Sequence, residues 1–208
     1  INLYTQGQFQ KALTQGSQLL KDFPNSINLY NIIGATSKGL GKMDVAIEAY
    51  NKALSLKPDY AEAYNNIGIA LQDQGKLEEA IGSYTKAFSL KPDYAESYWN
   101  LCGTSGNFNE AKKWIEQCLK ANPNYEKAKL TLTALKFYEG YKSEFSALVK
   151  SPLKDHPYVR SFTWAFSLPK LPPLYFHRWS LFDQMTKLSK KNRPFYEFGV
   201  WRGEAFKY

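Results

Sequence analysis

The 34-residue stretch AEAYNNIGIALQDQGKLEEAIGSYTKAFSLKPDY, residues 61–94, decides the fold of this chain. Before Gly75, its apolar side chains recur at intervals of three, four and seven residues, which places them on one face of a helix. A second apolar stripe follows Gly75 and stops before Pro92, which cannot continue a helix. The stretch therefore predicts a helix, a tight turn and a second helix.

The same unit recurs along the first part of the chain. Three kinds of residue recur every 34 residues. They are the glycines Gly7, Gly41 and Gly75, the alanines Ala12, Ala46 and Ala80, and the prolines Pro24, Pro58 and Pro92. A fixed period of this length indicates helical hairpins that stack and bury a continuous core. We expect Asp59 and Asp93 to cap the helices that follow the prolines. The small residue Gly68 predicts a close approach of two helices.

Eight positions of this unit resemble the tetratricopeptide repeat (TPR): Tyr64, Ile67, Gly68, Leu71, Ala80, Tyr84, Ala87 and Pro92. The resemblance implies an all-α fold, a right-handed superhelix of helix-turn-helix repeats whose first helices line a concave groove. It divides residues 1–125 into a partial repeat and three repeats: 1–26, 27–60, 61–94 and 95–125. The last repeat fits only if three residues are deleted near Gly103, so we expect its first helix to be almost a turn short.

Composition and charge limit the classes of function. Residues 1–125 hold 12 basic and 12 acidic residues, whereas residues 126–208 hold 15 and 7, so the whole net charge of +8 lies in the second part. Its lysines form no run and interleave with no aromatic RNA-binding motif, which disfavours nucleic acid as a partner. No stretch reaches the roughly 20 apolar residues of a membrane span. The histidines have no metal-ligand spacing.

Both cysteines, Cys102 and Cys118, fall where the repeat takes a small buried residue. This placement indicates inert core thiols and no disulfide. Thiols of this kind fit a reducing cytoplasm.

Polar residues of the first helices are the candidate contacts for a peptide in the groove. They are Asn31, Lys38, Asn65, Asn66, Gln72, Trp99 and Asn100. Asn66 and Asn100 occupy the same repeat position, which is similar to the asparagine ladder of the O-linked N-acetylglucosamine transferase repeats. Amides in such a ladder donate to and accept from an extended peptide backbone. The alternative is that these asparagines are simply solvated.

Charge at the same helices disfavours one class of ligand. A clamp for acidic peptide ends needs several Lys or Arg side chains. Only Lys38 is available, against Glu62, Asp73 and Glu96. The sequence therefore favours a groove that reads peptide backbone and shape.

The rest of the chain departs from the repeat. Residues 126–150 are expected to form degenerate helices that cap the array. Prolines and aromatic residues make 151–177 an irregular connector that packs against other parts of the protein. A helix is expected over 178–191, followed by a strand, a glycine turn and the start of a helix in 194–208.

The phrase EFGVWRG, residues 197–203, resembles the first motif of class I S-adenosylmethionine-dependent methyltransferases, in its macrocin O-methyltransferase-type form. The resemblance implies that Gly199 and Gly203 let S-adenosylmethionine approach closely and that Glu197 lies near its amine. Trp201 stands where many methyltransferases have glycine. Residues 178–208 would then begin a truncated methyltransferase domain, in which no catalytic residue can be named. We expect residues 1–208 alone to bind partners and not to catalyse or to hold the cofactor, and we expect S-adenosylmethionine and methyltransferase activity only of a full-length protein.

Three functions stay open. The first is a peptide-binding or protein-binding repeat module attached to an O-methyltransferase. The second is a pure scaffold in which Gly199 and Gly203 are only a turn, and the third is a repeat region that serves a glycosyltransferase. Self-association through exposed repeat ends is a further expectation.

Overall fold

The computed structural model describes residues 2–167, 196–199 and 204–207, and every regular element in the first of these ranges is a helix. The helices are α1 (Asn2–Thr5), α2 (Phe9–Asp22), α3 (Ile27–Gly39), α4 (Met43–Leu56), α5 (Ala61–Asp73), α6 (Leu77–Leu90), α7 (Ala95–Cys102), α8 (Phe108–Ala121), α9 (Glu126–Tyr138), α10 (Ser143–Val149), the 3-10 helix η1 (Pro152–Asp155) and α11 (Pro157–Phe166). The predicted all-helical repeat fold is thereby confirmed. The chain forms two compact units, residues 1–97 and 98–208.

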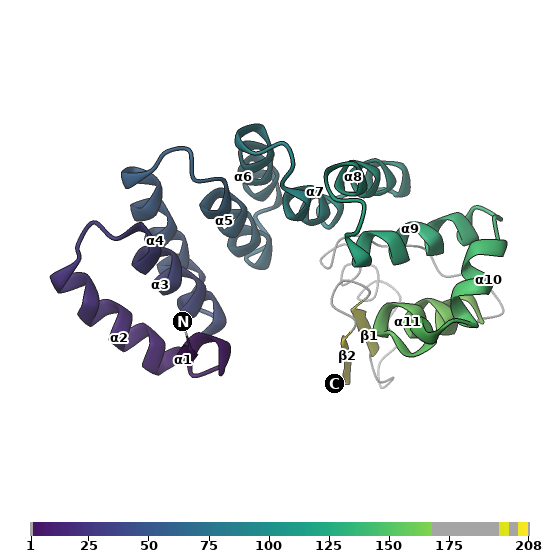
Figure 1. Ribbon diagram of the computed structural model, residues 1–208, viewed down its shortest axis with the longest axis horizontal. Helices are drawn as coiled ribbons and strands as arrows, with labels where there is room; N and C mark the ends of the chain where they lie inside the picture. The colour runs from purple at the N-terminus through teal and green to yellow at the C-terminus, as the bar shows by residue number, and fades with distance from the viewer. Residues whose placement is uncertain (1, 168–195, 200–203, 208) are drawn as a thin grey trace, which may run out of the picture. The chain divides into compact units, whose positions relative to one another are not determined.

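The first unit consists of stacked hairpins. α3 packs on α4 and α5 packs on α6, while α2 packs on α3 and α4 packs on α5 (Figure 1). Gly75 ends α5 with a φ of +79°, and the N–H of Lys76 donates to the carbonyl of Leu71 at 2.9 Å. This hydrogen bond and the left-handed glycine form the Schellman turn that the glycine spacing predicts.

Each hairpin is held by a tyrosine ring against a glycine. A Cβ added to Gly68 would lie 2.5 Å from Cε1 of Tyr84, and one added to Gly34 would lie 2.5 Å from Cε1 of Tyr50. Both tyrosines are fully buried. The close approach predicted at Gly68 is therefore confirmed, and the ring of the second helix is what occupies the space.

One predicted helix cap is wrong. Tyr60 is the residue that precedes α5, and no side chain caps this helix, so Asp59 does not do so. The first backbone bond runs from the N–H of Ala63 to the carbonyl of Tyr60, one residue beyond the expected cap. Lys57 instead places its ammonium 5.6 Å from the centre of the Tyr60 ring.

The shortened repeat begins where the two units divide, because α7 spans Ala95–Cys102 and the second unit starts at residue 98. α7 has 8 residues where α5 has 13, which confirms the predicted loss of about a turn. When the three-residue deletion near Gly103 is included in the alignment of the repeats, Cys102 occupies the position equivalent to Gly68. Ile115 then occupies the position equivalent to Tyr84. Both are fully buried. A larger residue on one helix is thus matched by a smaller one on the other, which keeps the volume of the core.

A further hairpin follows, which the sequence predicted only as helical. α9 and α10 meet at Gly140, whose φ is +102°, and the N–H of Tyr141 donates to the carbonyl of Lys136 at 2.9 Å. Gly140 follows Gly106 by the same interval that separates Gly41 from Gly75. The repeat period therefore resumes beyond the deletion.

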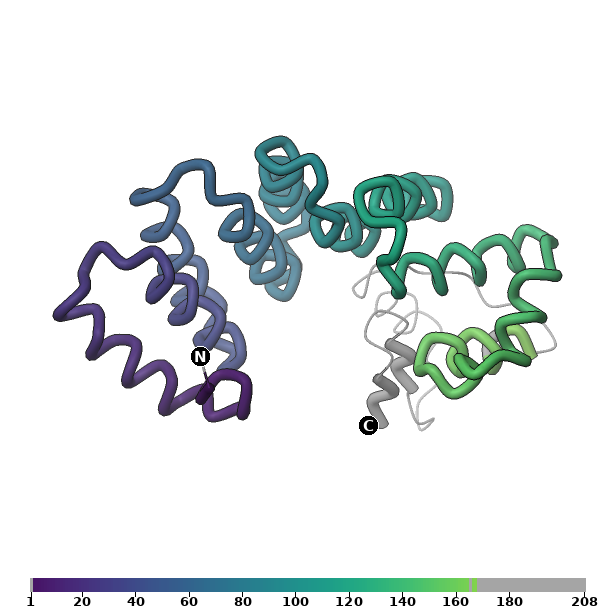
Figure 2. The backbone as a smooth tube through the Cα atoms, in the orientation of Figure 1, coloured from purple at the N-terminus to yellow at the C-terminus, as the bar shows by residue number. Residues whose placement is uncertain are grey.

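The predicted irregular connector is wrong over its first part. Residues 152–155 form η1 and residues 157–166 form α11, which lies beside α9 and α10 (Figure 2). Pro152 and Pro157 each occupy the first position of a helix, where a missing N–H costs nothing. The expected aromatic packing is confirmed, because Phe166 stacks on Phe137 with ring centres 4.4 Å apart. Residues 168–195, including the helix expected over 178–191, lie outside the described residues.

The last described elements form a hairpin. β1 (Tyr196–Gly199) pairs antiparallel with β2 (Glu204–Lys207), and Gly199 lies opposite Glu204. The helix start expected after Gly203 is wrong, since those residues are a strand. A short strand needs a partner for its backbone groups, and β2 supplies one to β1.

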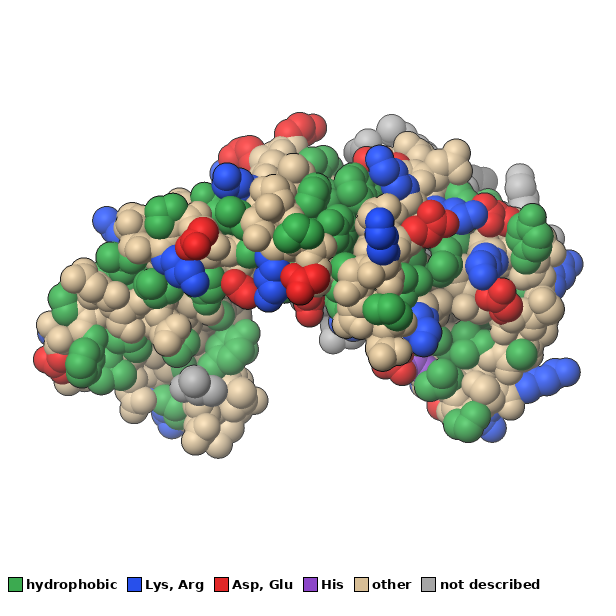
Figure 3. Space-filling view, turned by 45° about the horizontal axis from the view of Figure 1, so that its top comes forward, with side chains coloured by type: hydrophobic (Ala, Val, Ile, Leu, Met, Phe, Trp, Pro, Cys, Tyr) green, Lys and Arg blue, Asp and Glu red, His purple; other side chains and the backbone are tan. Residues whose placement is uncertain are grey.

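Charges of both signs mix on the surface. On the face seen in Figure 3, Lys and Arg side chains lie next to Asp and Glu side chains in both units. Within the described part of the chain, no helix is long and apolar enough to cross a bilayer.

Two glycine substitutions should have opposite effects on stability. Gly68→Ala places a methyl group against the Tyr84 ring and should lower the free energy of unfolding by about 1–3 kcal/mol. Gly82 lies in the middle of α6 with open space where a Cβ would be, so Gly82→Ala should raise that free energy by about 1 kcal/mol. Urea denaturation followed by circular dichroism measures both. Equal effects would contradict the close packing at Gly68.

The two cysteines should be protected from thiol reagents. Cys102 and Cys118 are reduced and fully buried, and burial raises the pKa of the Cys102 thiol. A buried thiol held protonated is a poor nucleophile. We expect no reaction with a chromogenic disulfide at mildly alkaline pH in the folded protein, and reaction of both thiols in urea. Fast reaction without denaturant would place them at the surface.

Candidate functional site

The candidate site in the first unit is the polar face shared by α3 and α5, called here the amide surface. Its members are Asn31, Lys38, Glu62, Asn66 and Gln72, all half-buried. α3 and α5 are the first helices of successive hairpins and contact one another directly. Side chains predicted from separate repeats are therefore neighbours in space.

An amide pair joins the two helices. The side-chain Nδ2 of Asn66 donates to Oδ1 of Asn31 at 3.2 Å. Each amide carries two donor hydrogens and an oxygen with two lone pairs, so this bond uses only part of what the pair offers. The Nδ2 group of Asn31 can still donate, and Oδ1 of Asn66 can still accept. A peptide group has one N–H donor and one carbonyl acceptor, so it needs an acceptor and a donor in a partner, and the amide pair offers both.

Gln72 is held in place by the core. The hydroxyl of Tyr84 donates to Oε1 of Gln72 at 2.7 Å, and burial raises the pKa of this tyrosine. The same position one repeat earlier is Lys38, which cannot accept a hydrogen bond. Lys38 could still donate to the Tyr50 hydroxyl, yet that hydroxyl is buried without a partner among the described residues. Gln72 therefore supports the hairpin as well as facing the amide surface.

An ion pair closes one edge of the surface. Lys91 Nζ lies 3.2 Å from Oε1 of Glu62 and 5.0 Å from the centre of the Tyr94 ring. Both charged side chains are more than a third exposed, so the pair contributes at most about 1 kcal/mol. Its main effect is to neutralise Glu62. Burial, then the nearby Glu96 and Glu62, raise the pKa of Tyr94.

Three predicted contacts lie elsewhere. Asn65 is only 4% exposed and makes its contacts inside the protein. Trp99 is 6% exposed, with its ring 5.8 Å from the Tyr125 ring and 6.4 Å from the Tyr158 ring, so a ligand cannot reach it without displacing these residues. Asn100 is half-buried and belongs to the second unit.

The structure gives no support to the cofactor site expected near the C-terminus. Glu197 and Gly199 lie in β1, while Trp201 and Gly203 fall outside the described residues. The expected motif needs a helix N-terminus after the strand to approach the cofactor's polar groups. β2 occupies that place. In the parts of the chain that the structure describes, no group of three or more His, Cys, Asp and Glu could hold a metal ion.

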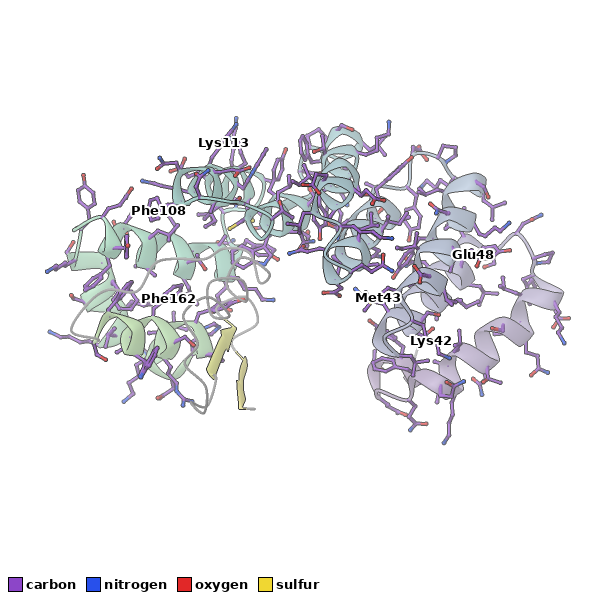
Figure 4. The ribbon with its side chains drawn as sticks, turned by 180° about the vertical axis from the view of Figure 1, so that it is seen from behind. Lys42, Met43, Glu48, Phe108, Lys113 and Phe162 are labelled. Carbon is purple, nitrogen blue, oxygen red and sulfur yellow. The ribbon has the colours of Figure 1, made fainter. Side chains whose placement is uncertain are left out.

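Sequence reasoning did not identify one surface feature on α4. A shallow depression on this helix is lined by Glu48 and its neighbours. Figure 4 labels the Glu48 side chain. The full set is Asp44, Ile47, Glu48, Asn51, Lys52 and Ser55. Because one helix supplies all of these residues, the depression has no opposing wall to enclose a ligand.

The two buried tyrosines offer a matched test of this geometry. Tyr84→Phe removes the bond to Gln72 and should lower the free energy of unfolding by about 1 kcal/mol. Tyr50→Phe removes a buried hydroxyl that has no partner among the described residues, so stability should stay the same or rise. Urea denaturation of the two variants gives the comparison. A larger loss for Tyr50→Phe would show that its hydroxyl is bonded in solution.

Comparisons with known proteins agree with the geometry. A family model described as TPR repeat matches residues 38–75. Two models described as tetratricopeptide repeat match residues 61–94 and 97–129. A search of curated proteins finds no match.

Solved structures share the fold. The crystal structure of MamA is 25% identical, with a TM-score of 0.58 over 74% of this chain and 91% of that chain. TTC0263, a thermophilic TPR protein in Thermus thermophilus, is 22% identical, with a TM-score of 0.62 over 80% and 95%. The first TPR of Spaghetti (RPAP3), bound to the HSP90 peptide SRMEEVD, is 23% identical, with a TM-score of 0.50 over 55% and 95%. Together with the recurring hairpins, these matches show that residues 38–94 and 97–129 are tetratricopeptide repeats.

Proposed function

We propose that the first unit binds an extended peptide segment of a partner protein on the amide surface. The observation that carries the proposal is the Asn66–Asn31 hydrogen bond, which fixes two amides side by side on adjacent repeats. A fixed amide pair loses little side-chain freedom when a ligand binds. The structural likeness to a TPR that holds a peptide supports this class of ligand.

The surface suits recognition of the backbone more than recognition of charge. Lys38 is its only cation, and Glu62 already pairs with Lys91. A peptide backbone presents the same N–H and carbonyl groups at every residue, so amides can bind it without selecting charged side chains. We infer that the sequence preference of this surface is broad and not directed at an acidic terminus.

An attached methyltransferase is not part of the proposal. It rested on the resemblance at residues 197–203, and the described part of that segment is an antiparallel hairpin. The proposed activity is therefore binding by the repeats.

The test is a selection followed by matched substitutions. Peptides selected from a random phage-displayed library are synthesised with a fluorescent label, and their affinities are measured by anisotropy. Asn31→Ala with Asn66→Ala should weaken the selected peptides about tenfold, since each lost hydrogen bond costs about 0.5–1.5 kcal/mol. Asn51→Ala, on the outer face of α4, is the control and should change nothing.

Two results would refute the proposal. One is that no peptide is selected, and the other is that every selected peptide keeps its affinity in the double variant. Thermal denaturation of each variant confirms that the fold is intact before binding is compared.

A further inference from the structure

A second surface of different chemistry lies in the other unit, on the exposed faces of α9 and α11. We call it the basic surface, and its members are Lys129, Thr133, Lys136, Arg160, Thr163 and Trp164. Lys129, Thr133 and Lys136 are spaced by four and three residues on α9, and Arg160, Thr163 and Trp164 by three and one on α11, so each set lies on one side of its helix. The buried residues of both helices lie between the stripe positions.

Aromatic contacts show that the two helices run parallel. Trp99 contacts both Tyr125, immediately before α9, and Tyr158, at the start of α11. At the other end, Phe166 of α11 stacks on Phe137 of α9. Their first turns therefore lie together, and so do their last turns.

Because the helices are parallel, Lys129 of α9 and Arg160 of α11 lie at similar heights along the helix axes. Lys129 follows Tyr125 by four residues, and Arg160 follows Tyr158 by two. At 1.5 Å per residue, the two Cα atoms differ in height along the helices by about 3 Å. Thr163 follows Lys129 by one full repeat period, at the equivalent repeat position, which puts the two stripes on the same side.

The two cations have no carboxylate partner among the described residues. The ion pairs of the second unit join Lys112 to Glu139 and Lys136 to Glu144. Neither Lys129 nor Arg160 forms an ion pair with any residue that the structure describes, and both are exposed. α11 contains no Asp or Glu. Glu126 also lies in the first turn of α9, three residues before Lys129, and forms no ion pair with any residue that the structure describes. Lys127, Lys129 and Arg160 outnumber it, so the first turns of α9 and α11 together carry a net positive charge.

An exposed aromatic ring lies one turn further along α11. Trp164 is 46% exposed, next to Thr163. The hydroxyls of Thr133 and Thr163 donate to carbonyls of their own helices, at 3.0 and 2.7 Å. Their donor hydrogens are therefore already used, which leaves Lys129 and Arg160 as the groups that can bind an anion.

We propose that the basic surface docks a short acidic peptide segment, with its carboxylates on Lys129 and Arg160 and an apolar side chain against Trp164. Arginine binds carboxylates through two parallel hydrogen bonds, and tryptophan adds apolar contact area. A nucleic acid would need a longer track of cations to follow its phosphates, and Lys112 and Lys136 are already paired. The inference is independent of the amide surface, which lies in the other unit.

The test compares three labelled probes by fluorescence anisotropy. The first is a peptide of alternating Asp and Glu around one Phe, the second replaces its acids with Asn and Gln, and the third is a short oligothymidylate. The acidic peptide should bind the whole protein best and lose affinity as salt is added. Tighter binding of the oligothymidylate, or equal binding of the uncharged peptide, would overturn the proposal.

Charge reversal locates the site. Lys129→Glu with Arg160→Glu should weaken the acidic peptide at least about tenfold. Lys113→Glu with Lys120→Glu is the matched control, because it reverses the same amount of charge at two exposed residues of α8, and Lys113 projects away from that helix (Figure 4). An equal loss in the control would show general attraction to a positive protein and would refute a specific surface. Binding of peptides to the amide surface should be unchanged in both variants, which keeps the two proposals separate.

Discussion

The contact of a tyrosine ring with a bare helix backbone determines the geometry of the repeats. At Gly34 and Gly68 no side chain separates the first helix from the ring of Tyr50 or Tyr84. A ring in that position fills the hairpin completely and fixes how far apart the two helices lie. Because successive hairpins share this spacing, their first helices come within reach of one another. The hydrogen bond between Asn66 and Asn31 depends on that proximity.

The same contact joins the core to the surface. The Tyr84 ring packs against the backbone at Gly68, and its hydroxyl donates a hydrogen bond to Gln72 on the polar face of α5. In the preceding repeat the packing is the same, but Lys38 stands where the glutamine would be, and the Tyr50 hydroxyl has no partner in the described part of the chain. Two repeats with the same packing thus differ in the hydrogen bonding of a buried hydroxyl. Surface and core positions in a repeat are therefore not independent.

Features fixed by local spacing could be predicted from the sequence, and features fixed by distant residues could not. The glycine at 75 needs a positive φ wherever the chain goes next, so the turn was predictable. The burial of Trp99 was not, because Tyr158, one of the rings that contacts it, lies far along the chain in a segment whose prolines suggested irregular structure. Pro152 and Pro157 fall at helix starts, a position that composition alone does not reveal. The candidate polar contacts on α3 and α5 were only partly predictable. Periodicity shows which face of the helix each side chain occupies, but its burial depends on residues that are distant in the sequence.

Fold and partner are set by different residues in such a chain. Packing needs a glycine opposite a tyrosine ring at Gly34 and Gly68, and turn glycines with positive φ at Gly41, Gly75 and Gly140. It leaves most outward positions free, apart from residues such as Gln72 that bond to the core, so one scaffold can carry an amide pair on α3 and α5 and cations with a tryptophan on α9 and α11. The repeat family therefore identifies the scaffold, while the chemistry of Asn66, Lys129 and Arg160 decides what each unit can hold. The two proposed surfaces differ in chemistry and belong to one chain, so on these proposals the protein would bring two unlike segments together.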